Sequence, residues 1–172
     1  MIPQASPTPR PATTLLAPGV RVADSQLQMP AFTVSASHPL PSGVSAALVV
    51  KDVQIDNLIE NIAIERQDPA LLQYADSGDW LAAEQGEIAS NKRQGLAVTS
   101  IVDNVTSIRL GSKPDPKDAS VVIAAIVTGT EVRGTSAAGR PTRKLTTSFS
   151  ALLWLRWSAS QQRYLICDAA TS

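Results

Sequence analysis

Two side chains in the first half of the chain are of the types that enzymes use for proton transfer. Tyr74 and Asp76 lie two positions apart, and a phenol beside a carboxyl group can serve proton abstraction next to a carbonyl group. Aspartate in such a place also commonly accepts hydrogen bonds from backbone N–H groups in turns and at helix starts. The sequence favours this structural role for Asp76, and Tyr74 and Asp76 remain the candidate residues of a catalytic alternative.

The chain contains one histidine and one cysteine. His38 precedes Pro39 in a proline-rich stretch, where a solvated linker side chain is expected. Cys167 has apolar neighbours and is expected to be a small buried side chain near the end of a strand. A single cysteine cannot form a disulfide within the chain, and a zinc site needs several ligands. The sequence therefore predicts no metal, no cofactor and no histidine-based catalysis.

The composition is typical of one domain with a hydrophobic core. The chain has 172 residues, of which 44% are hydrophobic, and its formal net charge is zero. Nucleic-acid binding is not expected, because contacts to phosphates require an excess of basic residues. No stretch of about 18 apolar residues is present, so no membrane span is predicted. Residues 1–4 lack the basic and apolar pattern of a signal peptide.

The charges are unevenly distributed along the chain. Residues 51–90 contain nine acidic and two basic residues, whereas residues 132–167 contain six basic residues and no acidic one. This separation predicts either attraction between helices and strands within the fold or a charged surface that orients a partner. Trp154 and Trp157 differ in parity along a predicted strand, so one of them should point outward. The predicted partner-binding residues are Arg133, Arg140, Arg143, Lys144, Trp154 and Trp157.

Helical patterns precede residue 95. Residues 45–66 show helical spacing of apolar side chains, and Ser45 is expected to cap this helix. Asp68 and Pro69 predict the start of a short second helix, and Asp79 predicts the cap of a third. The repeating apolar residues of the first helix are Ile55, Leu58, Ile59 and Ile62.

After residue 95 the pattern changes to that of β-strands. Segments rich in Val, Ile and Thr, joined by short turns, predict antiparallel neighbours. Such long strands must twist and bend, and the concave side of the sheet needs helices to cover it. We therefore predict an α+β fold with N-terminal helices packed in a curved four-stranded antiparallel sheet. The predicted strands comprise residues 96–110, 120–133, 143–157 and 163–170.

The beginning of the chain differs from the rest in composition. Residues 1–43 contain eight of the twelve prolines, which fix the backbone and remove hydrogen-bond donors. We predict a proline-rich extended arm or linker in residues 1–43 and one folded domain in residues 44–172. Apolar residues within 19–36 predict that this part packs on the domain as a short strand, which proline confines to a sheet edge.

Helices followed by four long strands resemble the cone of the NTF2-like (cystatin-like) superfamily over residues 45–170. The segment Leu71-Leu72-Gln73-Tyr74-Ala75 before a helix and the final strand Arg163-Tyr164-Leu165-Ile166 resemble accessory domains. Such domains occur in VirB8/TcpC-type secretion and conjugation proteins and in ARC6-type division proteins. The resemblance implies either a scaffold whose cone is filled by side chains or a pocket for a small molecule.

The favoured hypothesis is a non-enzymatic protein-interaction and assembly domain of a larger, envelope-associated complex of the secretion, conjugation or division type. Its partners would be other proteins or further copies of the chain. The alternative is a small-molecule-binding or lyase/isomerase protein that uses Tyr74 and Asp76 in the cone. A second alternative is a structural subunit whose N-terminal arm serves oligomerisation. The low-charge arm favours an extracytoplasmic or membrane-associated location, with a cytoplasmic one as the alternative.

Overall fold

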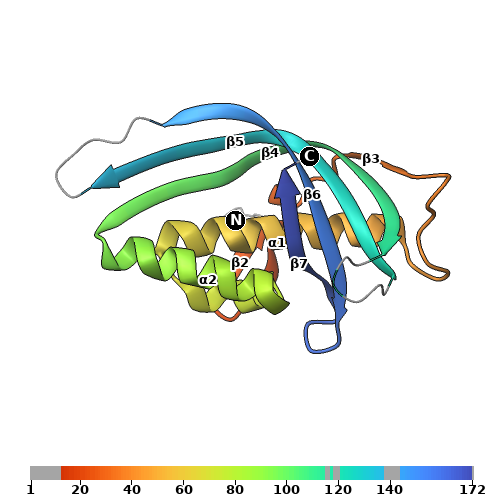
Figure 1. The fold of residues 1–172 in the computed structure, drawn as a ribbon, viewed down its shortest axis with the longest axis horizontal. Coiled ribbons are helices and arrows are strands. Elements are labelled where there is room, and N and C mark those ends of the chain that lie inside the picture. Colours follow the sequence, from red (N-terminus) through yellow and green to blue (C-terminus); the bar gives the residue numbers. More distant parts are fainter. Residues whose placement is uncertain (1–12, 115–116, 118–120, 138–143, 172) are drawn as a thin grey trace, which may run out of the picture.

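The computed structural model describes residues 13–114, 117, 121–137 and 144–171, and Figure 1 shows how their helices and strands are arranged. Short strands come first, the helices follow, and four long strands complete the chain. In chain order, the elements are β1 (Thr13–Ala17), β2 (Val20–Ala23), the 3-10 helix η1 (Asp24–Gln26), β3 (Ala31–Val34), α1 (Ala46–Arg66), the 3-10 helix η2 (Pro69–Tyr74), α2 (Gly78–Arg93), β4 (Leu96–Pro114), β5 (Val121–Ala137), β6 (Leu145–Ser158) and β7 (Arg163–Thr171).

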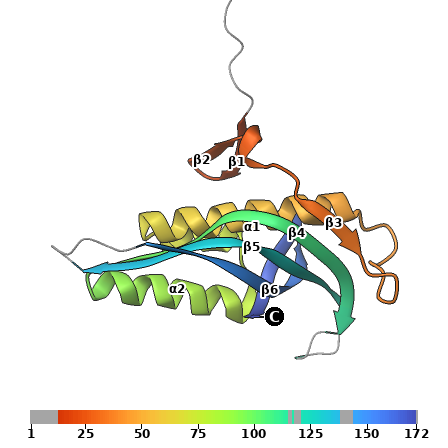
Figure 2. The same cartoon turned by 90° about the horizontal axis from the view of Figure 1, so that it is seen from above.

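The fold is α+β and mostly strand, but the prediction of helices packed in a four-stranded antiparallel cone is wrong. The main sheet has five strands in the order β3-β4-β5-β6-β7. It is a mixed sheet, because β3 is parallel to β4 while the other neighbours are antiparallel. β1 and β2 form a separate antiparallel pair, which Figure 2 shows beside α1, away from the long strands.

The fifth strand comes from the segment that the composition assigned to the arm. β3 follows Pro30 and pairs with residues 107–110 of β4, whose edge would otherwise expose a row of backbone donors and acceptors. The pairing continues where the Ser35 N–H donates to the Leu110 carbonyl at 2.8 Å and the Ser112 N–H donates to the His38 carbonyl at 3.0 Å. The predicted short edge strand within residues 19–36 is therefore confirmed, whereas the domain boundary at residue 43 stays a prediction.

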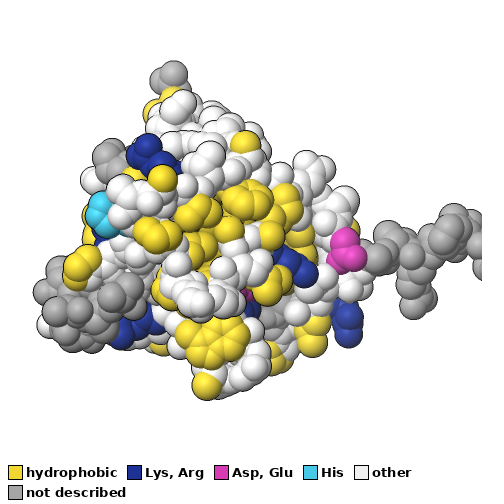
Figure 3. Space-filling model, turned by 90° about the vertical axis from the view of Figure 1, so that its right-hand side faces the viewer, with side chains coloured by type: hydrophobic (Ala, Val, Ile, Leu, Met, Phe, Trp, Pro, Cys, Tyr) yellow, Lys and Arg dark blue, Asp and Glu magenta, His cyan; other side chains and the backbone are white. Residues whose placement is uncertain are grey.

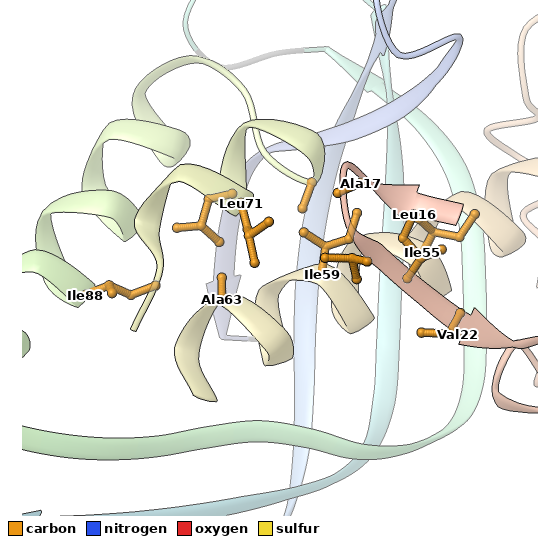
Figure 4. Close-up of a cluster of buried hydrophobic side chains, with 11 residues drawn as sticks. Leu16, Ala17, Val22, Ile55, Ile59, Ala63, Leu71 and Ile88 are labelled. Atoms are coloured by element: carbon orange, nitrogen blue, oxygen red, sulfur yellow. The ribbon is translucent and has the colours of Figure 1, made fainter. Parts of the chain in front are cut away.

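Helix α1 is packed on two sides. One buried cluster joins Val49, Val50 and Val53 of α1 to the main sheet. A second cluster, shown in Figure 4, joins Ile55 and Ile59 to β1, β2 and η2. The apolar stripe predicted for this helix thus faces the small hairpin and not the main sheet. Each side chain that is fully buried in these clusters contributes roughly 1.5–3 kcal/mol.

The helix starts largely follow the predicted capping signals. The Leu48 N–H donates to Ser45 Oγ at 3.4 Å, and Asp68 accepts a hydrogen bond from the Ala70 N–H at 3.1 Å at the start of η2. Helix α2 begins one residue before Asp79, with Ser77 as its N-cap. The prediction of Asp79 as the cap was therefore one turn position too late. None of the helices among the described residues is long and apolar enough to cross a membrane.

The strands β4, β5 and β6 extend beyond the part of the sheet that β7 covers. β5 pairs with β6 as far as Leu145, but β7 pairs with β6 only from Ser158 to Ala151. The projecting strand ends lie at the left of Figure 1. We call this part, residues 96–102, 131–137 and 145–149, the wing.

Candidate functional site

The polar face of α1 points into the fold. Asp56 is fully buried and accepts a hydrogen bond from Nη1 of Arg163 in β7. One turn earlier, Asp52 accepts a hydrogen bond from the Tyr164 N–H at 2.9 Å. Burial raises the pKa of Asp56 well above its ordinary value, although the positive charge of Arg163 opposes this. These contacts fasten α1 to β7.

A second buried carboxyl group follows η2. Asp76 is 1% exposed, and neither of its carboxyl oxygens has a hydrogen-bond partner within the described part of the chain. Burial, and then the charge of Glu60, raise the pKa of Asp76 to about 11, so this group is protonated at neutral pH. Glu60 accepts a hydrogen bond from Trp80 Nε1 at 3.5 Å, and burial raises its pKa as well. Paired carboxyl groups with separated pKa values are typical of acid–base sites.

A cleft of about 530 Å³ lies between the two α-helices and the inner face of the wing. Its volume is within the range of small-molecule sites, but such sites are mostly apolar, whereas this lining is rich in acidic groups. Burial, and then the charge of Glu60, raise the pKa of Glu84 to about 7. On the opposite wall, Glu131 is paired with Arg133 at 2.8 Å. The acidic residues that line the cleft are Glu60, Glu84, Glu87 and Glu131.

The outer edge of β4 is held by amide side chains of α1. The Asn61 side chain donates to the Val102 carbonyl at 2.9 Å and accepts from the Val102 N–H at 3.0 Å. The Gln67 side chain donates to the Leu96 carbonyl at 2.7 Å. These bonds replace those of a neighbouring strand, so α1 satisfies this edge and fixes the floor of the cleft.

The catalytic alternative placed Tyr74 and Asp76 at the mouth of a pocket, but neither residue lines the cleft. Tyr74 is half-buried against the second apolar cluster. Asp76 forms a backbone bridge with Ile166 of β7, which keeps its side chain inside the fold. The carboxyl groups that reach the cleft are those of Glu60 and Glu84, which the sequence analysis did not single out.

The remaining candidates with reactive side chains have structural surroundings. His38 is exposed, and its Nδ1 lies 3.0 Å from Ser37 Oγ. Cys167 is buried and not in a disulfide, as predicted. Among the described residues, no group of three or more His, Cys, Asp or Glu side chains could hold a metal ion.

The predicted partner-binding residues form two separate groups. Arg133 lies opposite Leu145 at the end of the wing, and Lys144 is the residue before Leu145. Trp157 lies twelve positions along β6, roughly 40 Å away at the rise of an extended strand, so the two groups cannot share one small contact. Arg140 and Arg143 lie outside the described residues.

The tryptophan group lies at the turn between β6 and β7. Trp157 is 54% exposed and packs edge-to-face on Tyr164, with ring centroids 5.3 Å apart. Trp154 is half-buried and lines a hollow of about 370 Å³ together with Asp168. The structure thus leaves Trp157 as the more exposed of the two. Neither its surroundings nor those of Trp154 identify a partner.

The sequence pattern missed the acidic cleft for a physical reason. Glu60, Glu84 and Glu131 come from two helices and a strand, at spacings that show no motif. Their only sequence signal was the acidic excess of residues 51–90, which was interpreted as a surface charge. Part of that excess is instead buried, because Asp56, Glu60 and Asp76 lie inside the fold.

Comparisons with known proteins give a likeness of fold only. No protein family matches the chain, and no curated protein is similar to it. A solved structure, the intermembrane space region of the chloroplast protein ARC6, is similar with a TM-score of 0.54 and 14% sequence identity. The match covers 77% of this chain and 98% of that one. The fold is therefore similar to that of the ARC6 region, whereas the wider NTF2-like assignment is not confirmed.

Proposed function

We propose that this chain is a protein-interaction domain of a larger, envelope-associated assembly and that it docks through the wing. The observation that supports this most directly is at the end of the wing, where Leu145 is 54% exposed. Arg133 lies opposite Leu145 on β5, and the exposed Lys144 precedes it. An apolar side chain framed by cations on a projecting strand suits a partner with complementary charge, because such charge orients the encounter.

The fold similarity supports the envelope part of this proposal. The ARC6 region with a similar fold is an intermembrane space domain of a chloroplast protein. We propose an extracytoplasmic or membrane-associated location for this chain, in a complex of the division, secretion or conjugation type. In this arrangement residues 1–43 would serve as a proline-rich tether and residues 44–172 as the docking domain.

The test is a tagged pull-down of the full-length protein from separated membrane and soluble fractions. The variant Arg133→Glu/Lys144→Glu reverses the charge of the wing, and Arg21→Glu/Lys113→Glu is a matched control at exposed residues of β2 and the far end of β4. We expect the native and control proteins to recover the same partners from membranes and the wing variant to recover at least tenfold less. Equal recovery by a wing variant with an unchanged melting temperature would contradict the proposal.

A second candidate function is the binding of a small molecule in the acidic cleft. Its volume of about 530 Å³ and the nearly neutral pKa of Glu84 favour a ligand with a cationic group. This version needs no catalysis by Tyr74 or Asp76. Thermal-shift screening of small amines should then find compounds that stabilise the native protein but not Glu84→Gln, and a screen with no such compound would count against it.

A further inference from the structure

One stretch of strand edge in the main sheet has no neighbour. The pairing of β7 with β6 ends where Thr171 lies opposite Ala151. The preceding residues of β6, Leu145–Phe149, pair with β5 on one side. On their other side, no strand among the described residues lies next to them. Their outward N–H and C=O groups are therefore available for a further strand.

The other edges of the sheet show how this fold normally treats such groups. β3 covers part of β4, and Asn61 bonds both backbone groups of Val102. On β7, the Ile166 N–H donates to the Ala75 carbonyl at 3.0 Å, and the Ser77 N–H donates to the Ile166 carbonyl at 2.8 Å. Against these covered edges, the open edge of β6 is an exception that calls for a partner.

The residues of this edge suit strand pairing. Leu145–Phe149 contain two threonines and a phenylalanine, which favour strands. No proline or charged side chain, the usual protections of an exposed edge, interrupts them. The first charge is Lys144, at the end of the stretch that is farthest from β7.

We propose that the β6 edge, Leu145–Phe149, binds an extended segment of a partner protein as an additional antiparallel strand with acidic residues at its C-terminal end. This inference rests on the proposed interaction function and names its binding mode. A segment in line with β7 would run antiparallel to β6, away from Thr171 and toward Lys144. Its C-terminal end would then lie beside Lys144 and near Arg133, where carboxylates are favoured. Five residues of strand provide a contact of roughly 17 Å.

A second copy of this chain fits the same edge less well. The stretch from Val132 to Ser150 contains four basic residues and no acidic one. The β6 edge of another copy would thus bring further cations to the wing and no carboxylate on the paired strand. The five-residue overlap also buries less area than the roughly 1,200 Å² of a stable interface. An acidic segment of another protein is the better complement.

The test uses amide hydrogen exchange of the full chain, read at each residue by NMR. The probe is the capped peptide Thr-Val-Thr-Val-Glu-Glu, the charge control is Thr-Val-Thr-Val-Lys-Lys, and the backbone control carries proline at its third position. We expect the outward amides within Leu145–Phe149 to exchange at least fivefold more slowly with the glutamate peptide at millimolar concentration. The lysine and proline peptides should leave these amides unchanged. Equal protection by the lysine peptide, or protection elsewhere only, would overturn the proposal.

Two further outcomes separate this inference from the proposed function. If the captured native partner depends on Arg133 and Lys144 but leaves the amides of Leu145–Phe149 unprotected, strand addition is wrong and the interaction function stands. If these amides become protected with rising protein concentration alone, and sedimentation shows a doubled mass, then a second copy is the occupant and the acidic-partner proposal fails. A pull-down without any partner refutes the proposed function whatever the peptide does.

Discussion

Arg163 in the last strand and Asp56 in the middle of α1, 107 positions apart in the chain, form a buried ion pair. The pair joins the helix to β7 where the helix turns a polar face toward the sheet. One carboxyl oxygen of Asp56 and one guanidinium nitrogen of Arg163 have no hydrogen-bond partner among the described residues. A buried pair that is only partly satisfied fixes the position of α1 more than it stabilises the fold.

Removing one member of this pair should cost more than removing both. Arg163→Met leaves the carboxyl group of Asp56 buried without its cation, and we expect a loss of about 3–5 kcal/mol in the free energy of unfolding. The double variant Asp56→Leu/Arg163→Met should regain most of that loss, because apolar packing replaces the pair. Urea unfolding of the native, single and double variants measures the coupling, and additive losses in the double variant would refute this account.

The buried carboxyl group of Asp76 should make stability depend on pH. Its pKa is about 11 in the folded chain against 3.8 as the model value, so the folded state holds a proton that the unfolded state releases between these values. The associated stability is fully present below about pH 4 and declines as pH rises toward 11, by at most about 1.4 kcal/mol per pH unit. Glu84 adds a decline between 4.5 and about 7.

The variant Asp76→Asn isolates this effect, because the amide has the shape of the carboxyl group and does not titrate. We expect it to be more stable than the native chain at pH 8 and to lose less stability between pH 5 and 9. Urea unfolding at several pH values provides the measurement. An identical pH slope in both proteins would show that Asp76 is not the titrating group.

The amide bonds between Asn61 and Val102 should be needed to close the edge of β4. Asn61→Ala removes both bonds and leaves two backbone groups without partners, at an expected cost of about 1–3 kcal/mol. Exchange of the Val102 amide should accelerate. Asn91→Ala is the matched control, because Asn91 also lines the cleft but is not bonded to β4. A similar loss in both variants would argue against a specific role of the edge contact.

Gly129 should be intolerant of any side chain. A Cβ atom there would lie 2.0 Å from the backbone oxygen of Asn104, next to the two irregularities in the β4–β5 pairing. We expect Gly129→Ala to destabilise the protein by about 1–3 kcal/mol through backbone displacement. Gly86→Ala, in α2 with nothing within 4 Å of the added atom, should instead stabilise it by about 0.5–1 kcal/mol. Thermal unfolding decides this, and equal melting temperatures for the two variants would refute the clash.

Local patterns identified much of the fold because capping and alternation act over a few residues. Ser45, Asp68 and Pro69 are where the capping signals put them, and the four long strands occur where Val, Ile and Thr gather. The strand β3 was assigned to the arm because proline dominates the composition around it. Its four residues become a strand only because the edge of β4 offers partners for their backbone groups.

The sequence by itself determined the order of the elements, the positions of most helix starts and the separation of acidic and basic segments. Which face of α1 meets the sheet was decided by the tertiary structure, because two apolar clusters compete for the helix and the hairpin β1–β2 covers the predicted stripe. That choice buries Asp56 and turns Glu60 toward the cleft. Likewise, only the point at which β7 stops along β6 leaves Leu145–Phe149 open, since strand register depends on partners far away in the chain.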